Sequence, residues 1–473
     1  MLSATGSHPY KAQKIPVNKS KFFKKIQTEN SFSEFNTMPL TTQITSASAL
    51  TVKKNRLIDT IHHTSGTFGA KGQWGSHETE TGVCRLALSD EDKGVRDWFV
   101  GELKSLDCIV KIDELGNIFG IYPGKNDGKP TAIGSHLDTQ PTGGRYDGIL
   151  GVLSGLEVLR TMKDNGFVPN YPICVVDWMN EEGARFPMSM MSSSVWAKAA
   201  DIDEIYAMKS VTDKVPVSVR DELSRIGYLG DVPCSYEANP LAAHFELHIE
   251  QGPILEEQNK KIGRVQGIQA LRWIELTMKG KAQHTGTTPL GSRSDALLAS
   301  AQIVVKGNEI AKKYGGLFSC GIMELEPAVV NVIPQQVRFV VDMRHHLDEK
   351  LDNMYAEFSE NLSQIVTNAG VKLQFEQKEL VNQKAVHFDE TCMKCIEESS
   401  DEIFGKDESL PIVSGAGHDS GLTALRIPTA MIFIPSKDGV SHNFEEYSTP
   451  EQVDEGFRVL LGAVLKYDAL REE

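Results

Sequence analysis

The first half of the chain alternates short, nearly continuous apolar runs with longer segments whose apolar residues recur at helical spacing. Residues 130–135 and 173–178 are such runs, and they indicate strands that are covered on both faces. Residues 148–162 lie between them and carry apolar side chains three and four positions apart, which predicts a helix. Because buried strands alternate with helices, we expect an α/β domain with a central mixed sheet and helices on both faces.

The middle of the chain has a different order of predicted elements: strand, helix, two strands, helix, strand. This order is typical of a small ferredoxin-like α+β domain. The α/β pattern then returns with a strand at residues 429–434 and a helix at residues 450–469. The predicted strands of the middle region are 272–279, 319–325, 337–344 and 371–376, and its predicted helices are 294–313 and 349–369.

A chain of 473 residues exceeds what one compact core usually holds. We therefore predict a larger domain in two segments, residues 48–269 and 381–473, interrupted by the small domain at residues 270–380. Residues 1–47 are rich in Ser, Thr and Lys and lack apolar periodicity, which predicts a disordered extension. That segment contains no Arg, which favours this interpretation over a mitochondrial presequence.

The composition argues against some classes of partner. The formal net charge is −15 and the sequence pI is near 5.4, which disfavours nucleic-acid binding through clustered basic residues. No apolar run approaches the roughly 20 residues that span a bilayer, so we expect no membrane segment. The seven cysteines are odd in number and scattered, as is typical of reduced thiols in a cytoplasmic protein. The C-x-x-C pair Cys392 and Cys395 falls in a predicted helix, and we interpret it as structural.

Metal-binding side chains lie close to the ends of predicted strands and helices. Taken singly, each has an ordinary explanation: His136 as a structural residue and Asp147 as a helix cap. Together, three imidazoles and two carboxylates form the ligand set that borderline-soft divalent metals prefer, and one carboxylate can bridge two ions about 3.5–4 Å apart. Asp138 is placed to fix the tautomer of His136. The candidate ligands are His136, Asp147, His248, His442 and either Glu181 or Glu182. The other glutamate of this pair would act on a water molecule.

Three further residues have the chemistry to contact a substrate. His284 lies in a segment rich in turn-forming residues, and His418 lies in a glycine-rich turn. Arg344 ends a predicted strand and is suited to bidentate binding of a carboxylate. For each of the three taken alone, a structural or surface role is the more common one.

The motifs together resemble a known family. They are Gly-Ser-His136-Leu-Asp138-Thr, Tyr-Asp147-Gly, Asn-Glu181-Glu182-Gly-Ala-Arg-Phe186, His248-Ile-Glu-Gln251-Gly-Pro253 and Gly-His418-Asp-Ser. This set resembles the amidohydrolase branch of the zinc aminoacylase and carboxypeptidase superfamily, which includes N-carbamoyl-L-amino-acid hydrolases, allantoate amidohydrolases and the fungal β-alanine synthases. The resemblance covers the chain from about residue 55 to the C-terminal helix. Residues 175–186 and 432–443 look most similar to the β-alanine synthases.

The resemblance implies a dinuclear metal site. His136, Asp147 and His248 would hold one ion, and Asp147, Glu182 and His442 would hold the second. The ions would be Zn²⁺, with Mn²⁺, Co²⁺ or Ni²⁺ as alternatives. Glu181 would be the general base, with Asp138 beside it in the catalytic group.

The resemblance also implies substrate contacts and a homodimer. His284 and Asn331 would reach into the site of the neighbouring subunit, where His284 would stabilise the oxyanion. Arg344 would bind the substrate carboxylate, and the small domain would serve for dimerisation and as a lid. The carbamoyl end of the substrate would be contacted by Gln251, Gly417 and His418.

The reaction favoured by the resemblance is hydrolysis of N-carbamoyl-β-alanine to β-alanine, CO₂ and NH₃, a step of pyrimidine degradation. The alternatives are hydrolysis of N-carbamoyl-L-α-amino acids or of allantoate, because these substrates also combine a ureido group with a carboxylate. A binding protein without activity is a further alternative, and the presence of Glu181 and of all five ligands argues against it. Aminopeptidase or aminoacylase activity is disfavoured because the turn around His418 resembles the ureido-hydrolysing branch.

Overall fold

The computed structural model describes residues 49–369 and 372–471, so the expectation for residues 1–47 lies outside the described residues. The described residues fall into two compact units. The smaller unit spans Ala270–Ala385, and the larger unit contains the remaining described residues on both sides of it. The boundary expected at residue 380 falls inside a strand, β14 (Gln374–Gln383).

The larger unit is built on a mixed sheet with the strand order β15-β8-β17-β7-β5-β6-β4-β3, and β16 also pairs with β8, in parallel. The central strands β17, β7, β5 and β6 are parallel to one another, whereas β3, β4 and β15 pair in antiparallel fashion. The strands are β3 (Ile109–Ile112), β4 (Ile118–Tyr122), β5 (Thr131–Ser135), β6 (Ile173–Asp177), β7 (Ala243–Ile249), β8 (Ile262–Ile268), β15 (Val386–His387), β16 (Ser409–Ser414) and β17 (Thr429–Ile434). A separate ribbon pairs β1 (Ala70–Gln73) with β2 (Thr81–Val83).

Helices cover both faces of this sheet, and the alternation of side chains along β7 shows it. The Phe245 ring lies 5.5 Å from the Tyr467 ring of α12. The next side chain, Glu246, points to the opposite face and accepts a hydrogen bond from Ser420 of α11. The helices of this unit are α1 (Arg56–Thr67), α2 (Asp90–Ser105), α3 (Ile149–Asp164), α4 (Met191–Trp196), α5 (Ile202–Ala207), α6 (Val219–Ile226), α7 (Ile254–Glu257), α10 (Glu390–Phe404), α11 (Asp419–Thr423) and α12 (Pro450–Leu470), with the 3₁₀ turn η3 (Lys437–Gly439). The α/β expectation is confirmed.

The parallel strands bring the predicted metal ligands to one edge of the sheet. β5 leads directly into His136, β6 leads into the turn before Glu181, and β7 carries His248 near its end. β17 leads into the loop that carries His442. Because the carboxyl ends of parallel strands lie at the same edge, side chains far apart in the sequence converge there.

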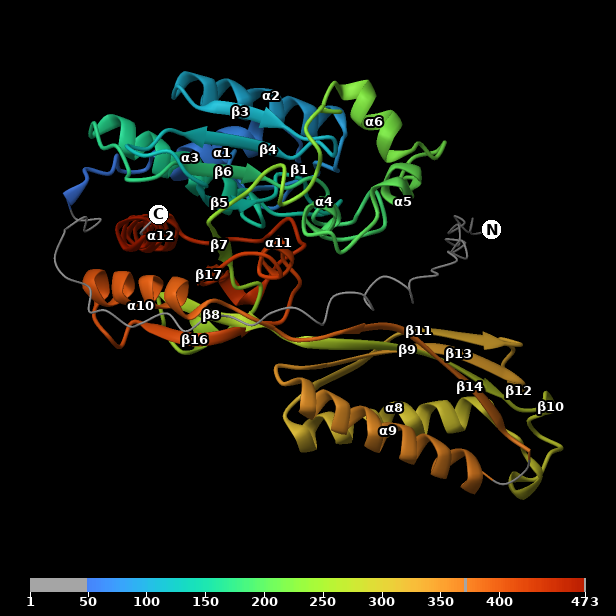
Figure 1. The fold of residues 1–473 in the computed structure, drawn as a ribbon. Coiled ribbons are helices and arrows are strands. Elements are labelled where there is room, and N and C mark those ends of the chain that lie inside the picture. Colours follow the sequence, from blue (N-terminus) through green and yellow to red (C-terminus); the bar gives the residue numbers. More distant parts are fainter. Residues whose placement is uncertain (1–48, 370–371, 472–473) are drawn as a thin grey trace. The chain divides into compact units, whose positions relative to one another are not determined.

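The smaller unit has the ferredoxin-like order β9, α8, β11, β13, α9, β14, and its antiparallel sheet has the order β11-β13-β9-β14. Helices α8 and α9 pack on one face of this sheet (Figure 1). The predicted strand at 371–376 differs from the structure, because β14 begins at Gln374 and continues to Gln383. The elements are β9 (Ala270–Lys279), β10 (Gln283–His284), η2 (Leu290–Ser292), α8 (Ala296–Tyr314), β11 (Leu317–Glu326), β12 (Val332–Ile333), β13 (Gln336–His345) and α9 (Asp348–Asn368).

Each unit has its own apolar core, and α12 in the larger unit illustrates how the sequence produces it. Thr449 caps the helix and forms a capping box with Gln452, and Pro450 occupies the first turn. Residues 459–465 of the helix are apolar and buried without interruption, so this part is covered on all sides by the sheet and neighbouring helices. None of the helices in the described part of the chain combines the length and apolar character needed to cross a membrane.

Candidate metal centre

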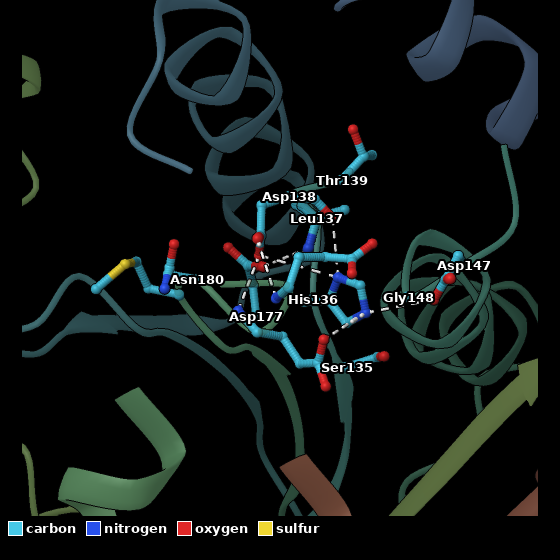
Figure 2. A network of polar contacts seen from close by, with 12 residues as sticks. Ser135, His136, Leu137, Asp138, Thr139, Asp147, Gly148, Asp177 and Asn180 are labelled. Carbon is cyan, nitrogen blue, oxygen red and sulfur yellow. Dashed lines mark hydrogen bonds and ion pairs between the residues drawn. The ribbon is translucent and has the colours of Figure 1, made fainter. Parts of the chain in front are cut away.

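His136 follows β5 directly, and its orientation is set by a local hydrogen bond. Its Nδ1 donates to the carbonyl oxygen of Asp138 at 2.9 Å, which directs Nε2 to Asp147 Oδ1 at 3.7 Å (Figure 2). Gly148 makes room for this ring: its φ is +68°, and a Cβ there would lie 2.2 Å from His136 Cε1. The sequence predicts Asp138 as the partner that fixes the His136 ring. In the structure, the main-chain carbonyl of Asp138 provides this contact.

His248 approaches the same carboxylate oxygen from β7. Its Nδ1 donates to the carbonyl oxygen of Ile249 at 2.9 Å, which directs Nε2 to Asp147 Oδ1 at 3.1 Å. Both imidazoles are buried and therefore have few alternative orientations. Oδ1 of Asp147 thus faces His136 and His248.

The other oxygen of Asp147 faces a second set of side chains. His442 Nε2 lies 3.3 Å from Asp147 Oδ2 and 3.4 Å from Glu182 Oε2. The backbone of His442 has a φ of +54°, which non-glycine residues adopt rarely and often at functional sites. Asp147 therefore lies between two ligand sets and presents one oxygen to each.

The donor chemistry of the two sets fits two divalent cations. In each set, the candidate ligand atoms of His136, Asp147 and His248, or of Asp147, Glu182 and His442, lie within 4.8 Å of one another. Burial opposes ionisation of Asp147, but hydrogen bonds from the three histidines hold its pKa well below its usual range. Burial and the Asp147 charge raise the pKa of Glu182 to about 7. A cation between these carboxylates would offset their repulsion and satisfy imidazole and carboxylate ligands together.

Glu181 lies beside the first set and is held through its backbone. Asp138 Oδ1 accepts the N–H of Glu181 at 3.2 Å, and Asp138 Oδ2 accepts the N–H of Glu182 at 3.4 Å. Glu181 Oε2 lies 3.6 Å from His136 Nε2. Burial, together with the nearby charges of Asp419 and Glu182, raises the pKa of Glu181 well above its usual range. A carboxylate of that kind is suited to accept a proton and to release it again.

A buried ionic network that sequence reasoning missed supports the turn that follows His136. Asp177 Oδ1 accepts the N–H of Leu137 at 3.0 Å (Figure 2), and Arg85 Nε donates to the carbonyl of Leu137 at 2.7 Å. Arg96 forms an ion pair with Asp177 at 3.2 Å and with Asp92 at 2.8 Å. The only available signal was the spacing of Asp92 and Arg96, four residues apart on one side of a helix.

The predicted contacts to the carbamoyl end also lie in the larger unit. Gln251 Nε2 donates to Asp147 Oδ2 at 2.8 Å and to Ser441 Oγ at 3.1 Å. His418 is buried, with its ring centre 4.6 Å from that of His248, and its Nε2 shares a 2.9 Å hydrogen bond with Ser414 Oγ. Burial and the neighbouring His248 lower the pKa of His418 to about 3, so its ring is neutral. Gly417 precedes it, between β16 and α11.

Three predicted substrate contacts, His284, Asn331 and Arg344, belong to the smaller unit. His284 and Asn331 lie at the ribbon formed by β10 and β12, and Thr285 donates to the carbonyl of Asn331 at 3.0 Å. His284 is exposed. Arg344 lies near the end of β13 and forms an ion pair with Asp342 at 2.7 Å.

Comparisons with known proteins agree with this chemistry. The sequence profile of peptidase family M20/M25/M40 matches residues 132–466. The chain is 40% identical to the N-carbamoyl-L-amino-acid amidohydrolase of Rhizobium meliloti over 81% of this chain and 91% of that protein. It is 31% identical to the allantoate amidohydrolase of Bacillus subtilis over 83% of this chain and 94% of that protein. The crystal structure of a hydantoinase/carbamoylase family amidase from Burkholderia multivorans is similar with a TM-score of 0.82 and 41% identity, covering 90% of this chain and 100% of that one.

Proposed function

The chain belongs to peptidase family M20/M25/M40, and we propose that it hydrolyses the carbamoyl C–N bond of N-carbamoyl-L-α-amino acids. At the coarser level it is an amidohydrolase of the N-carbamoyl-amino-acid and allantoate type. The observation that carries the proposal is the Asp147 carboxylate, which presents one oxygen to each of two ligand sets beside Glu181.

The preferred substrate differs from the one that the sequence favoured. The motif resemblance favoured N-carbamoyl-β-alanine, whereas the relatives described above are named for N-carbamoyl-L-amino acids and allantoate. N-carbamoyl-β-alanine stays the second candidate because residues 175–186 and 432–443 resemble the β-alanine synthases. Both substrates carry a ureido group and a carboxylate, so the same side chains would serve for either.

In the proposed mechanism, His136, Asp147 and His248 would hold one divalent ion, and Asp147, Glu182 and His442 the other. Two bound ions, Zn²⁺ or otherwise Mn²⁺, Co²⁺ or Ni²⁺, would lower the pKa of water and polarise the carbamoyl carbonyl. Glu181 takes a proton from the attacking water while the water oxygen bonds to the carbonyl carbon. The same carboxyl then gives that proton to the departing nitrogen as the C–N bond breaks.

His284 and Arg344 would act on the substrate itself. His284 Nδ1 accepts the N–H groups of Gly286 at 3.0 Å and Thr287 at 3.3 Å, so the ring proton is on Nε2. That N–H would donate to the oxyanion that develops on the carbamoyl oxygen. Arg344 would bind the substrate carboxylate with its planar guanidinium.

A substrate panel tests the proposed function with metal-reconstituted protein. It compares N-carbamoyl-L-α-amino acids, N-carbamoyl-β-alanine, allantoate and N-acetyl amino acids by kcat/KM. We expect the highest value for an N-carbamoyl-L-α-amino acid. A highest value for N-carbamoyl-β-alanine would select the second candidate, and hydrolysis of N-acetyl amino acids alone would reject both.

Arg344→Ala is expected to lower kcat/KM for carboxylated ureides by about 10- to 100-fold, since hydrogen bonds to charged groups contribute roughly 1.5–3 kcal/mol. Hydrolysis of the matching substrate amide, which has no carboxylate, should change little. Arg338→Ala is the matched control, because Arg338 lies on the same strand and face and pairs with Glu275 at 2.8 Å. An unchanged kcat/KM in Arg344→Ala would exclude this residue from substrate binding.

We further propose that a second copy of this chain completes the site. β11 is an edge strand with four exposed apolar side chains, Leu317, Ile322, Met323 and Leu325. An exposed apolar edge of this kind favours pairing with another chain. His284 and Asn331 are both exposed and lie together at the β10–β12 ribbon, so both could be donated to the partner at once.

Subunit complementation tests the donated histidine. Dimers that combine one Glu181→Gln subunit with one His284→Ala subunit are isolated by two affinity tags. They should recover about half of the wild-type activity, because a twofold dimer would then contain one site with both residues intact. The two variants measured as homodimers are the controls and should both be nearly inactive. Mixed dimers without activity would show that His284 acts within its own subunit.

A further inference from the structure

Glu446 is a buried carboxylate whose hydrogen bonds all lead to the candidate metal centre. Glu446 is only 2% exposed. Glu446 Oε1 accepts the backbone N–H groups of Tyr146 and Asp147, each at 3.0 Å. Glu446 Oε2 lies 3.0 Å from Ser441 Oγ. No motif in the sequence distinguished this residue from a surface acid.

These contacts connect two loops that are distant in the sequence. One loop carries Asp147 between β5 and α3, and the other carries His442 after β17. Ser441 Oγ also lies 2.9 Å from Asp147 Oδ2, the oxygen that faces His442. The single hydroxyl proton can go to either carboxylate, and the Gln251 amide donates to the hydroxyl oxygen. Glu446 therefore restrains both the backbone of Asp147 and the loop that holds His442.

The chain provides space for this close approach. A Cβ at Gly144 would lie 2.2 Å from Glu446 Oε1, so only glycine lets the carboxylate reach the N–H groups of Tyr146 and Asp147. Burial, with the charge of Asp147, raises the pKa of Glu446 to about 7. Burying a carboxyl group costs free energy unless hydrogen bonds compensate for the lost water. Every hydrogen bond described for the Glu446 side chain leads to the candidate centre.

We infer that Glu446 is a positioning residue that aligns Asp147 and His442 for the second ion of the proposed metal centre. The two sets differ in how they are held. In the first set, His136 and His248 are oriented by backbone carbonyls at 2.9 Å and do not depend on the 441–446 loop. In the second set, His442 and the Oδ2 oxygen of Asp147 both adjoin Ser441, which Glu446 holds. Loss of Glu446 should therefore weaken the second set more than the first.

The test is stepwise binding of Zn²⁺ to metal-stripped, full-length protein, followed by chelator competition. Glu446→Ala should weaken the second ion by about 10- to 100-fold, the range found for residues that orient metal ligands, and weaken the first ion clearly less, because Asp147 is the one ligand of the first set that Glu446 holds. Glu446→Gln should retain most of the affinity, because its amide oxygen can still accept both N–H groups. Asp468→Ala is the matched control: Asp468 is also 2% exposed and accepts two backbone N–H groups, of Asn170 at 2.7 Å and Tyr171 at 2.9 Å.

The possible outcomes separate this inference from the proposed function on which it rests. Wild-type affinity for both ions in Glu446→Ala would overturn the inference, and so would equal weakening of both ions or the same loss in Asp468→Ala. If Glu446→Ala does not fold, Ser441→Ala removes the shared hydroxyl, and unchanged binding of the second ion there has the same consequence. Wild-type protein that binds no Zn²⁺ would instead reject the proposed metal centre, and the inference with it.

Discussion

Glu181→Gln is expected to lower kcat by about 10²- to 10⁴-fold, the usual contribution of a positioned general base. Glutamine has nearly the same shape but cannot accept the proton of the attacking water. The backbone N–H of residue 181 would still donate to Asp138 Oδ1, so the turn that carries the side chain should be preserved. The measurement is kcat on the best substrate of the panel, together with metal content and thermal unfolding.

Glu182→Gln provides the contrast for this experiment. Glu182 Oε2 lies 3.4 Å from His442 Nε2 in the second ligand set, so its loss should lower the metal content as well as the activity. Glu181→Gln should keep the wild-type metal content. A near-normal kcat in Glu181→Gln would remove this residue from the proton transfer, and loss of metal there would identify it as a ligand instead.

Removal of divalent metal is expected to reduce kcat/KM by about 10³-fold or more, since metal ions contribute several kcal/mol to such transition states. Restoring Zn²⁺, Mn²⁺, Co²⁺ or Ni²⁺ should return the activity, with up to two ions bound per chain. The physical reason is the ligand set: three imidazoles and two carboxylates converge around Asp147.

The control for metal removal is Ca²⁺, which prefers oxygen ligands and should not restore activity at a site rich in imidazole. Atomic absorption or emission measurements on the same samples would give the stoichiometry. Full activity in rigorously stripped protein would contradict the dinuclear proposal. Full recovery of activity with a single ion per chain would restrict the metal requirement to the first or the second ligand set.

Local periodicity in the sequence was enough to predict most of the elements that carry the site. The apolar run at residues 173–178 corresponds to β6 (Ile173–Asp177), and the helical spacing at 148–162 corresponds to α3 (Ile149–Asp164). These elements depend on neighbouring residues, so their pattern is visible without the rest of the chain. The strand at 371–376 was misplaced because none of the side chains of β14 is buried and the strand carries a weaker apolar alternation.

The sequence by itself determined the kinds of side chain available and the strand ends to which they are attached. Only the tertiary structure decided how they meet: the Oδ1 oxygen of Asp147 faces His248, and its Oδ2 oxygen faces His442. It also decided that Glu446, separated from Asp147 by 299 positions, would hold the backbone of that residue. The reason is physical: secondary structure follows from local spacing, whereas such contacts depend on the order of strands in the sheet and on turns with unusual backbone angles, as at His442.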